Sequence, residues 1–152
     1  MLETVTEDID FARLMKQHIQ DLVIHFFEKE QNFGILCKIE DAGFDPELPH
    51  EINAEFRPLT LFFLAGYTFE TARIEDDLLV FEAGFGTDNI GSIVSVPLLS
   101  IMQIIVDETP IFINLATLKE LPSIDEKQLD TNGVENSMAS FLSNPENSKF
   151  LK

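Results

Sequence analysis

The chain has 152 residues, of which 45% are hydrophobic, and a formal net charge of -17 from 27 acidic and 10 basic residues. This length and apolar content suit one domain with a real core and exclude disorder throughout. The charge disfavours nucleic acid and anionic membranes as partners, because their phosphate groups would be repelled. Met1 to Thr4 lack the features of a signal peptide, and no apolar run nears the ~20 residues that span a bilayer. We therefore expect a cytoplasmic protein.

A long amphipathic helix is predicted from Thr6 to Lys29. Apolar residues recur there at helical spacing, Thr4 and Glu7 offer a capping pair at its start, and Asn32 and Gly34 supply a stop. The apolar stripe is wider than packing on one sheet face requires, which fits either a deeply buried helix or a helix-mediated dimer. The residues assigned to this dimer helix are Phe11, Met15, Ile19, Leu22, Val23 and Phe26.

Short strands separated by turns are predicted after the helix. β-Branched and aromatic residues dominate six segments, and the stretches between them are rich in residues that favour turns. Strands in close succession indicate an antiparallel meander or a small barrel, and not alternating strand–helix units. The expected strands are 33–40, 52–56, 59–68, 71–74, 78–84 and 92–96, with turns at 43–46, 75–77 and 86–89.

The last ordered elements are predicted to be a helix and a strand. Pro97 is suited to the first turn of a helix, and the nearly all-apolar segment 98–105 is expected to form a short buried one. Residues 110–115 are predicted as the final strand. From Thr117 onward the composition turns polar without a sustained period, which predicts a disordered tail. Residues 1–116 hold 21 acidic and six basic residues, so the ordered part carries about -15 of the charge.

Few residues suggest chemistry. Cys37, the only cysteine, lies in an apolar run and is expected to be a buried thiol. His18, Asp21 and His25 lie near one face of the predicted helix, but without a fourth ligand they give weak support for a metal site, and no metal is predicted. The glycines within 84–91 do not follow a phosphate-loop spacing, and no nucleophile–base pair can be named. Neither a cofactor nor an enzymatic activity is therefore predicted, although glycines at a strand end let a peptide backbone come close.

Several short motifs follow one another in an order that covers most of the chain. Leu64-Ala65 and Asp76-Asp77 precede a strand containing Phe81 and ending in Ala83-Gly84-Phe85-Gly86, and Val94-Ser95-Val96-Pro97-Leu98 comes next. With the opening helix, the polar tail and the hydrophobic-plus-Lys terminus, this order resembles the SspB family, bacterial adaptors that deliver tagged substrates to the ClpXP protease. The family has A-R-F-G-G and V-S-V-P-L at the two strand motifs, so Gly84 stands where the family has Arg.

The resemblance implies an α+β fold in which an N-terminal dimerisation helix precedes a small, strongly bent antiparallel Sm-like β-barrel with one short inserted helix. It implies a peptide-binding domain (1–116) whose groove grips a degradation tag of the tmRNA (ssrA) type, a flexible linker (117–147) and a ClpX-docking motif (148–152). Tethering would raise the concentration of substrate near the protease, without chemistry by the adaptor. The implied peptide-binding residues are Leu64, Ala65, Ala83, Phe85, Gly86, Val94 and Ser95, and the implied ClpX-docking residues are Phe150, Leu151 and Lys152.

Two other classes of protein remain open. A type III secretion chaperone is also small, acidic, dimeric and α+β, and would bind an extended segment of a partner protein, but it has no need of the terminal Phe150-Leu151-Lys152. A small hydrolase has less support, because it requires a nucleophile and a base that the sequence does not identify. The acidity bears on the adaptor hypothesis too, since an acidic tag would be repelled by a domain at about -15 unless Arg57 or Arg73 supplied a local positive charge.

Overall fold

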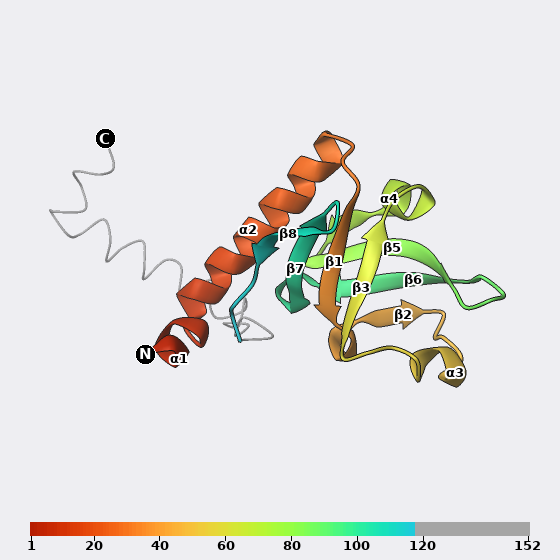
Figure 1. Cartoon of the computed structure of the whole chain (residues 1–152), viewed down its shortest axis with the longest axis horizontal. Coiled ribbons are helices and arrows are strands. Elements are labelled where there is room, and N and C mark those ends of the chain that lie inside the picture. The colour runs from red at the N-terminus through yellow and green to blue at the C-terminus, as the bar shows by residue number, and fades with distance from the viewer. Residues whose placement is uncertain (118–152) are drawn as a thin grey trace, which may run out of the picture. The chain divides into compact units, whose positions relative to one another are not determined.

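The computed structural model describes residues 1–117 and has an α+β architecture, as predicted (Figure 1). Two helices, α1 (Leu2–Thr6) and α2 (Ile9–Glu28), come first, and two four-stranded antiparallel sheets with short helical segments follow. The remaining elements are β1 (Phe33–Lys38), η1 (Ile39–Asp41), β2 (Gly43–Asp45), α3 (His50–Asn53), β3 (Leu59–Leu64), α4 (Tyr67–Thr71), β4 (Arg73–Glu75), β5 (Leu78–Phe85), β6 (Ile90–Pro97), η2 (Leu98–Ser100), β7 (Ile101–Val106) and β8 (Thr109–Ile113).

The two sheets are separate. The first has the strand order β3-β1-β7-β8 and the second has the order β2-β6-β5-β4. Figure 1 shows β1 and β3 running across β5 and β6, with the inner faces of the sheets turned toward one another. Within residues 1–117 no strand pairing joins the sheets into a closed barrel, so the closed form of the expected barrel is not observed. The alternation of apolar residues identifies the buried face of each strand but does not determine which strand edges meet.

The long helix begins later than predicted. Asp8 is its N-cap, with extended backbone and a carboxylate that accepts a hydrogen bond from the Phe11 N–H at 2.9 Å. The predicted capping pair, Thr4 and Glu7, is wrong, because Thr4 lies inside the separate helix α1 and Glu7 ends it. α2 also ends before the predicted stop, at Glu28, and the chain turns through Glu30, which has a φ of 53°. Among residues 1–117, no helix is both long and apolar enough to cross a bilayer.

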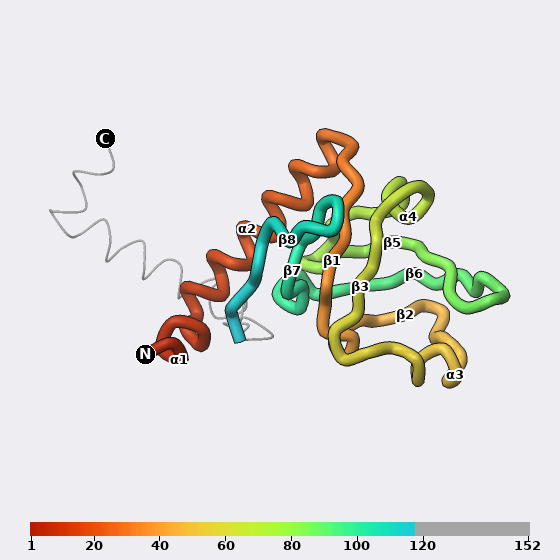
Figure 2. The backbone as a smooth tube through the Cα atoms, viewed as in Figure 1, coloured from red at the N-terminus to blue at the C-terminus, as the bar shows by residue number. Residues whose placement is uncertain are grey.

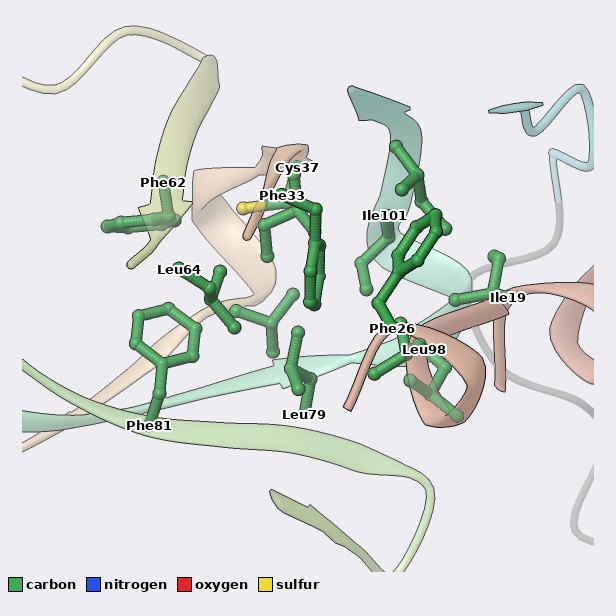
Figure 3. Close-up of a cluster of buried hydrophobic side chains, with 14 of the residues drawn as sticks. Ile19, Phe26, Phe33, Cys37, Phe62, Leu64, Leu79, Phe81, Leu98 and Ile101 are labelled. Carbon is green, nitrogen blue, oxygen red and sulfur yellow. The ribbon is translucent and has the colours of Figure 1, made fainter. Parts of the chain in front are cut away.

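The core lies between α2 and the inner faces of the two sheets. Ile19, Val23 and Phe26 of α2 belong to it, and Figure 3 shows Ile19 and Phe26 beside Leu98 and Ile101. The same figure shows side chains from β3 facing those of β5. Cys37 is fully buried, which confirms the prediction, and this burial raises the pKa of its thiol to about 12. The core residues that come from the strands include Phe33, Ile35, Phe62, Leu64, Leu79, Phe81, Val94, Val96, Ile101 and Ile104.

Three predicted elements are wrong. Residues 98–105 form the short η2 and the strand β7 instead of a helix, because an unbroken apolar run carries no periodicity and β7 finds partners on both sides, β1 and β8. Residues 52–56, predicted as a strand, belong to α3 and the turn after it. Residues 43–46, predicted as a turn, contain the strand β2, which pairs with β6.

Other predicted boundaries hold more closely. The turn at 75–77 is confirmed, with both Asp76 and Asp77 at positive φ, as a tight hairpin between β4 and β5 requires. The turn at 86–89 joins β5 to β6. The predicted strand 59–68 ends at Leu64, and the short helix α4 follows it.

The last described residue is fixed to the beginning of the chain. Thr117 donates two hydrogen bonds to the backbone oxygen of Thr6, from its N–H at 2.8 Å and from its Oγ1 at 3.0 Å. Asn114, nearly fully buried, donates from its side chain to the backbone oxygens of Leu99 and Ile101, both at 3.1 Å. The segment after β8 is thereby attached both to the core and to α1.

Candidate functional site: a trough on the second sheet

A pocket of about 340 Å³ lies on the outer face of the second sheet, and we call it the trough. Along β5 the core positions Leu79 and Phe81 alternate with Glu82 and Gly84, which face away from the core. The trough is lined by Asp45, Pro46, Tyr67, Glu82, Ala83, Gly84, Asn89, Gly91, Ser92 and Ile93.

The strand register determines how the trough is built. Glu82 is paired with Ile93, and Ile93 is paired on its other side with Asp45, so these three side chains form one row across β5, β6 and β2. Gly84 is paired with Gly91 in the neighbouring row. Two paired glycines leave the sheet without side chains at that point, and they form the floor of the trough. The row that contains Ile93 forms one of its walls.

Asn89 forms the opposite side. A Cβ placed on Gly84 would lie 1.8 Å from Asn89 Oδ1, so the Asn89 side chain folds directly over Gly84. A Cβ placed on Gly91 would meet nothing within 4 Å, so the floor is open above that residue. The floor of the trough is therefore open above Gly91, whereas Asn89 covers Gly84.

Hydrogen bonds connect the elements that surround the trough. Tyr67, from α4, donates its hydroxyl to Glu82 Oε2 at 2.5 Å, and this bond raises the pKa of Tyr67. The Glu82 N–H donates to Thr71 Oγ1 at 2.9 Å, which attaches α4 to β5 a second time. Ser92 Oγ donates to the backbone oxygen of Pro46 at 2.9 Å, which attaches β6 to the segment after β2. The trough is thus held from both sides before any ligand enters.

One edge of β5 lacks a strand partner beside the trough. β4 pairs with β5 only from Leu78 to Val80, and beyond Val80 the edge faces α4. Because backbone groups alternate in direction along a strand, Gly84 presents its N–H and C=O to the same side as the Glu82 N–H. Within residues 1–117 no strand pairs with this side of β5 beyond Val80. An extended peptide could add to the sheet at this edge.

The structure does not bring the predicted peptide-binding residues together in one site. Leu64 and Val94 are fully buried in the core, and Ala65 is exposed after β3. Ser95 lies on the outer face of the second sheet between Gly43 and Val80. The structure brings only Ala83 of this set to the trough.

Phe85 and Gly86 lie at the far end of β5. The Phe85 ring makes edge contacts with Phe44, Phe56 and Phe62, at centroid distances of 5.7, 5.9 and 6.2 Å. Phe44 and Phe56 also line a second hollow, of about 610 Å³. Gly86 has a φ of 73° and no room for a side chain, because a Cβ would lie 3.1 Å from the end of Ile52.

Sequence reasoning missed most residues of the trough. Because the turn at 86–89 fixes the pairing of β5 and β6, alternation along the two strands is a signal that could have placed Glu82 and Ile93 on one face. Asp45 and Tyr67 gave no such signal, since the first was predicted in a turn and the second in a strand.

Four of the six residues assigned to a dimer helix, namely Ile19, Leu22, Val23 and Phe26, pack in the protein's own core. Ile19 and Val23 are fully buried and Phe26 nearly so, while Phe11, Met15 and Leu22 are partly buried. The large apolar residues that α2 does expose are Ile9, Leu14 and Ile24.

The remaining candidate residues do not form a site in the structure. Asp21 accepts a hydrogen bond from Gln17 at 2.9 Å, and the His18 ring packs 6.2 Å from that of Phe112. Residues 1–117 contain no group of three or more His, Cys, Asp or Glu side chains that could hold a metal ion. The expected linker and the docking residues Phe150, Leu151 and Lys152 lie outside the described residues.

Comparison with known proteins finds no protein-family model that matches this chain and no curated protein that is significantly similar to it.

Proposed function

We propose that this chain is a non-enzymatic adaptor that binds an extended peptide, such as a tmRNA-type degradation tag, and tethers the tagged protein to the ClpXP protease. The observation that carries the proposal is the trough, whose floor of Gly84 and Gly91 adjoins the edge of β5 that lacks a strand partner. A peptide backbone can approach a sheet closely where side chains are missing. The hydrogen bonds of Tyr67 and Ser92 hold the walls in place, which lowers the ordering cost of binding.

The arrangement of the shared motifs supports the same function. The Ala83–Gly86 motif begins on β5 and the Val94–Leu98 motif begins on β6. These two strands are paired along their whole length, from the pair Leu78 and Pro97 to the pair Phe85 and Ile90. An adaptor of the SspB type needs these two motifs side by side. In this proposal the two sheets are the halves of a split, Sm-like barrel, and residues 148–152 provide the contact to ClpX.

The proposal includes a homodimer, which the resemblance implies. Because the inward residues of α2 are buried, the helix offers a partner its exposed positions Ile9, Leu14 and Ile24. The contact would therefore use residues that widen the apolar stripe, such as Leu14 and Ile24, and not the buried positions assigned to the dimer helix.

A reconstituted degradation assay tests the adaptor function. A fluorescent protein carrying a tmRNA-type tag would be degraded by purified ClpXP at a limiting substrate concentration, with and without the full chain. We expect the chain to accelerate degradation, and a variant that lacks Ser148–Lys152 to bind the tagged protein without accelerating its degradation. The proposal is rejected if the full chain neither binds the tagged protein nor changes the rate, and the tethering role is rejected if the shortened chain accelerates degradation equally.

A further inference from the structure

The trough has the dimensions and lining of a pocket for one long side chain. Ile93 lies in one wall of the trough, between Glu82 on β5 and Asp45 on β2. Neighbouring strands lie about 4.8 Å apart, so the two acidic positions are separated by about 10 Å across the apolar Ile93. An apolar stretch with a carboxylate at each end complements an aliphatic stem with a charged head, which is the construction of lysine and arginine side chains.

The two carboxylates are not neutralised. Neither Asp45 nor Glu82 forms an ion pair within residues 1–117, and none of the basic side chains in that part of the chain lines the trough. Glu82 accepts a hydrogen bond from the neutral Tyr67 hydroxyl, which orients the carboxylate. Other acidic side chains do have a basic partner: Asp77 pairs with Lys16, and Glu75 pairs with Arg73.

Tyr67 adds a second feature that favours a cation. Its side chain is attached to the rim of the trough through Glu82, yet the residue is 66% exposed. A cation held beside this carboxylate would lie near the tyrosine ring, and aromatic faces attract ammonium and guanidinium groups. An acidic ligand would meet two carboxylates here and about -15 of charge on the domain, without an arginine at position 84 to offset them.

We infer that the trough is a subsite for one side chain of the bound peptide, and that at this position it prefers lysine or arginine to an acidic residue. This inference rests on the proposed function, namely that the trough binds an extended peptide. It adds the chemical class of the ligand: the aliphatic stem packs on Ile93 and the charged head bonds to Glu82 or Asp45.

Binding to defined peptide pools tests the inference. Four pools of short, N-terminally acetylated, fluorescently labelled peptides would carry Lys, Arg, Gln or Glu at one central position and mixed residues elsewhere. Acetylation removes the competing α-amino group. Affinity for the full-length chain would be measured by fluorescence anisotropy at low and high salt. Glu82→Gln and Asp45→Asn test the trough, and Glu70→Gln, which removes the same charge from an exposed position on α4, is the matched control.

We expect the Lys and Arg pools to bind at least about ten-fold more tightly than the Glu pool, since a charge-assisted bond contributes on the order of the free energy of a ten-fold change. Glu82→Gln should remove most of this preference and Glu70→Gln should retain it. Equal binding of all pools, tighter binding of the Glu pool, or an equal loss in Glu70→Gln would overturn the inference and leave the adaptor proposal standing. Failure of every pool to bind would overturn both.

Discussion

Asn89 Oδ1 occupies the space in which a residue other than glycine would carry its Cβ at position 84, only 1.8 Å from that point. Asn89 has a φ of 50°, which asparagine tolerates better than most residues, and its N–H bonds to the Gly86 oxygen at 3.2 Å. The placement of the Asn89 side chain in this turn therefore requires glycine at position 84. The side chain that borders the trough keeps its position only while Gly84 has none.

Alanine substitutions at the two floor glycines should have different effects on stability. Gly84→Ala must displace the Asn89 side chain, which is exposed and can rotate, so we expect it to lower the free energy of unfolding by at most about 1 kcal/mol. Gly91→Ala places its methyl group in open space. Because glycine weakens a strand interior, we expect the free energy of unfolding to stay the same or to rise by up to about 1 kcal/mol.

Both substitutions should weaken peptide binding, because both put a methyl group on the floor of the trough. Urea unfolding and peptide anisotropy on the same samples separate the two effects. A Gly91→Ala variant that is stable and binds as well as the original chain would show that the trough is not the binding site.

Asp8 should contribute more to stability than Thr4. Asp8→Ala removes the side-chain bond to the Phe11 N–H, and the loss of an N-cap reduces the free energy of unfolding by about 1 kcal/mol. Thr4→Ala is the control, since Thr4 is exposed within α1 and caps nothing. Thermal unfolding followed by circular dichroism measures the difference, and equal midpoints for the two variants would contradict the position of the helix start.

Two phenylalanines on facing sheets provide a test of the core. Phe81 is fully buried in the second sheet, whereas Phe63 in the first sheet is 63% exposed. Phe81→Ala should reduce the free energy of unfolding by about 3–5 kcal/mol, because it removes a large buried ring and leaves a cavity. Phe63→Ala should change it by less than about 1 kcal/mol. Similar losses in urea titrations would mean that Phe63 is covered in solution.

Cys37 should be nearly inert toward thiol reagents in the folded protein. Burial raises the pKa of its thiol to about 12, so at pH 8 almost none is present as the reactive thiolate. The pKa of this thiol is about 9 in the unfolded chain and about 12 in the folded one. The free energy of unfolding should therefore fall as the pH rises from about 9 toward 12, because only the unfolded thiol loses its proton in that range. Reaction with a chromogenic disulfide reagent should be slow without urea and fast with it. Rapid labelling of the native protein at pH 8 would rule out this buried position.

The exposed side of α2 should decide whether two copies associate. Leu14 is 57% exposed, and Leu14→Glu would place an additional negative charge there without disturbing the core. We expect sedimentation velocity to show a dimer for the original chain and a monomer for this variant, with Glu28→Gln as a control for an unrelated change of charge at the far end of the helix. A monomer in the original chain at high concentration would remove the dimer from the proposed function.

The elements that sequence analysis predicted well are those with a clear period. The residues Ile19, Val23 and Phe26 recur at helical spacing, and α2 buries all three. The alternation along β5 and β6 and the Asp76–Asp77 turn are local signals too, and the structure retains them. By contrast, 98–105 is apolar at almost every position, so neither a helix nor a strand period can be recognised. Its strand form depends on β1 and β8, which are distant in the sequence.

The trough was beyond sequence analysis for a similar reason. It combines Tyr67, Glu82 and Asp45 from three elements, and only the pairing of β2 with β6 and the packing of α4 against β5 bring them together. The glycines at 84 and 91 were recognised as places for close approach, but the sequence did not show that they face one another.

The double hydrogen bond between Thr117 and Thr6 has a mechanical consequence. Figure 2 shows α1 and the chain near Thr117 at one end of residues 1–117, and the turn between β5 and β6 at the opposite end. A pulling force applied at Thr117 would first load its two bonds to Thr6 and then the side-chain bonds of Asn114, which attach the same segment to the core. Under the proposed function, the bonds that such a force loads first would lie at the opposite end of residues 1–117 from the turn between β5 and β6.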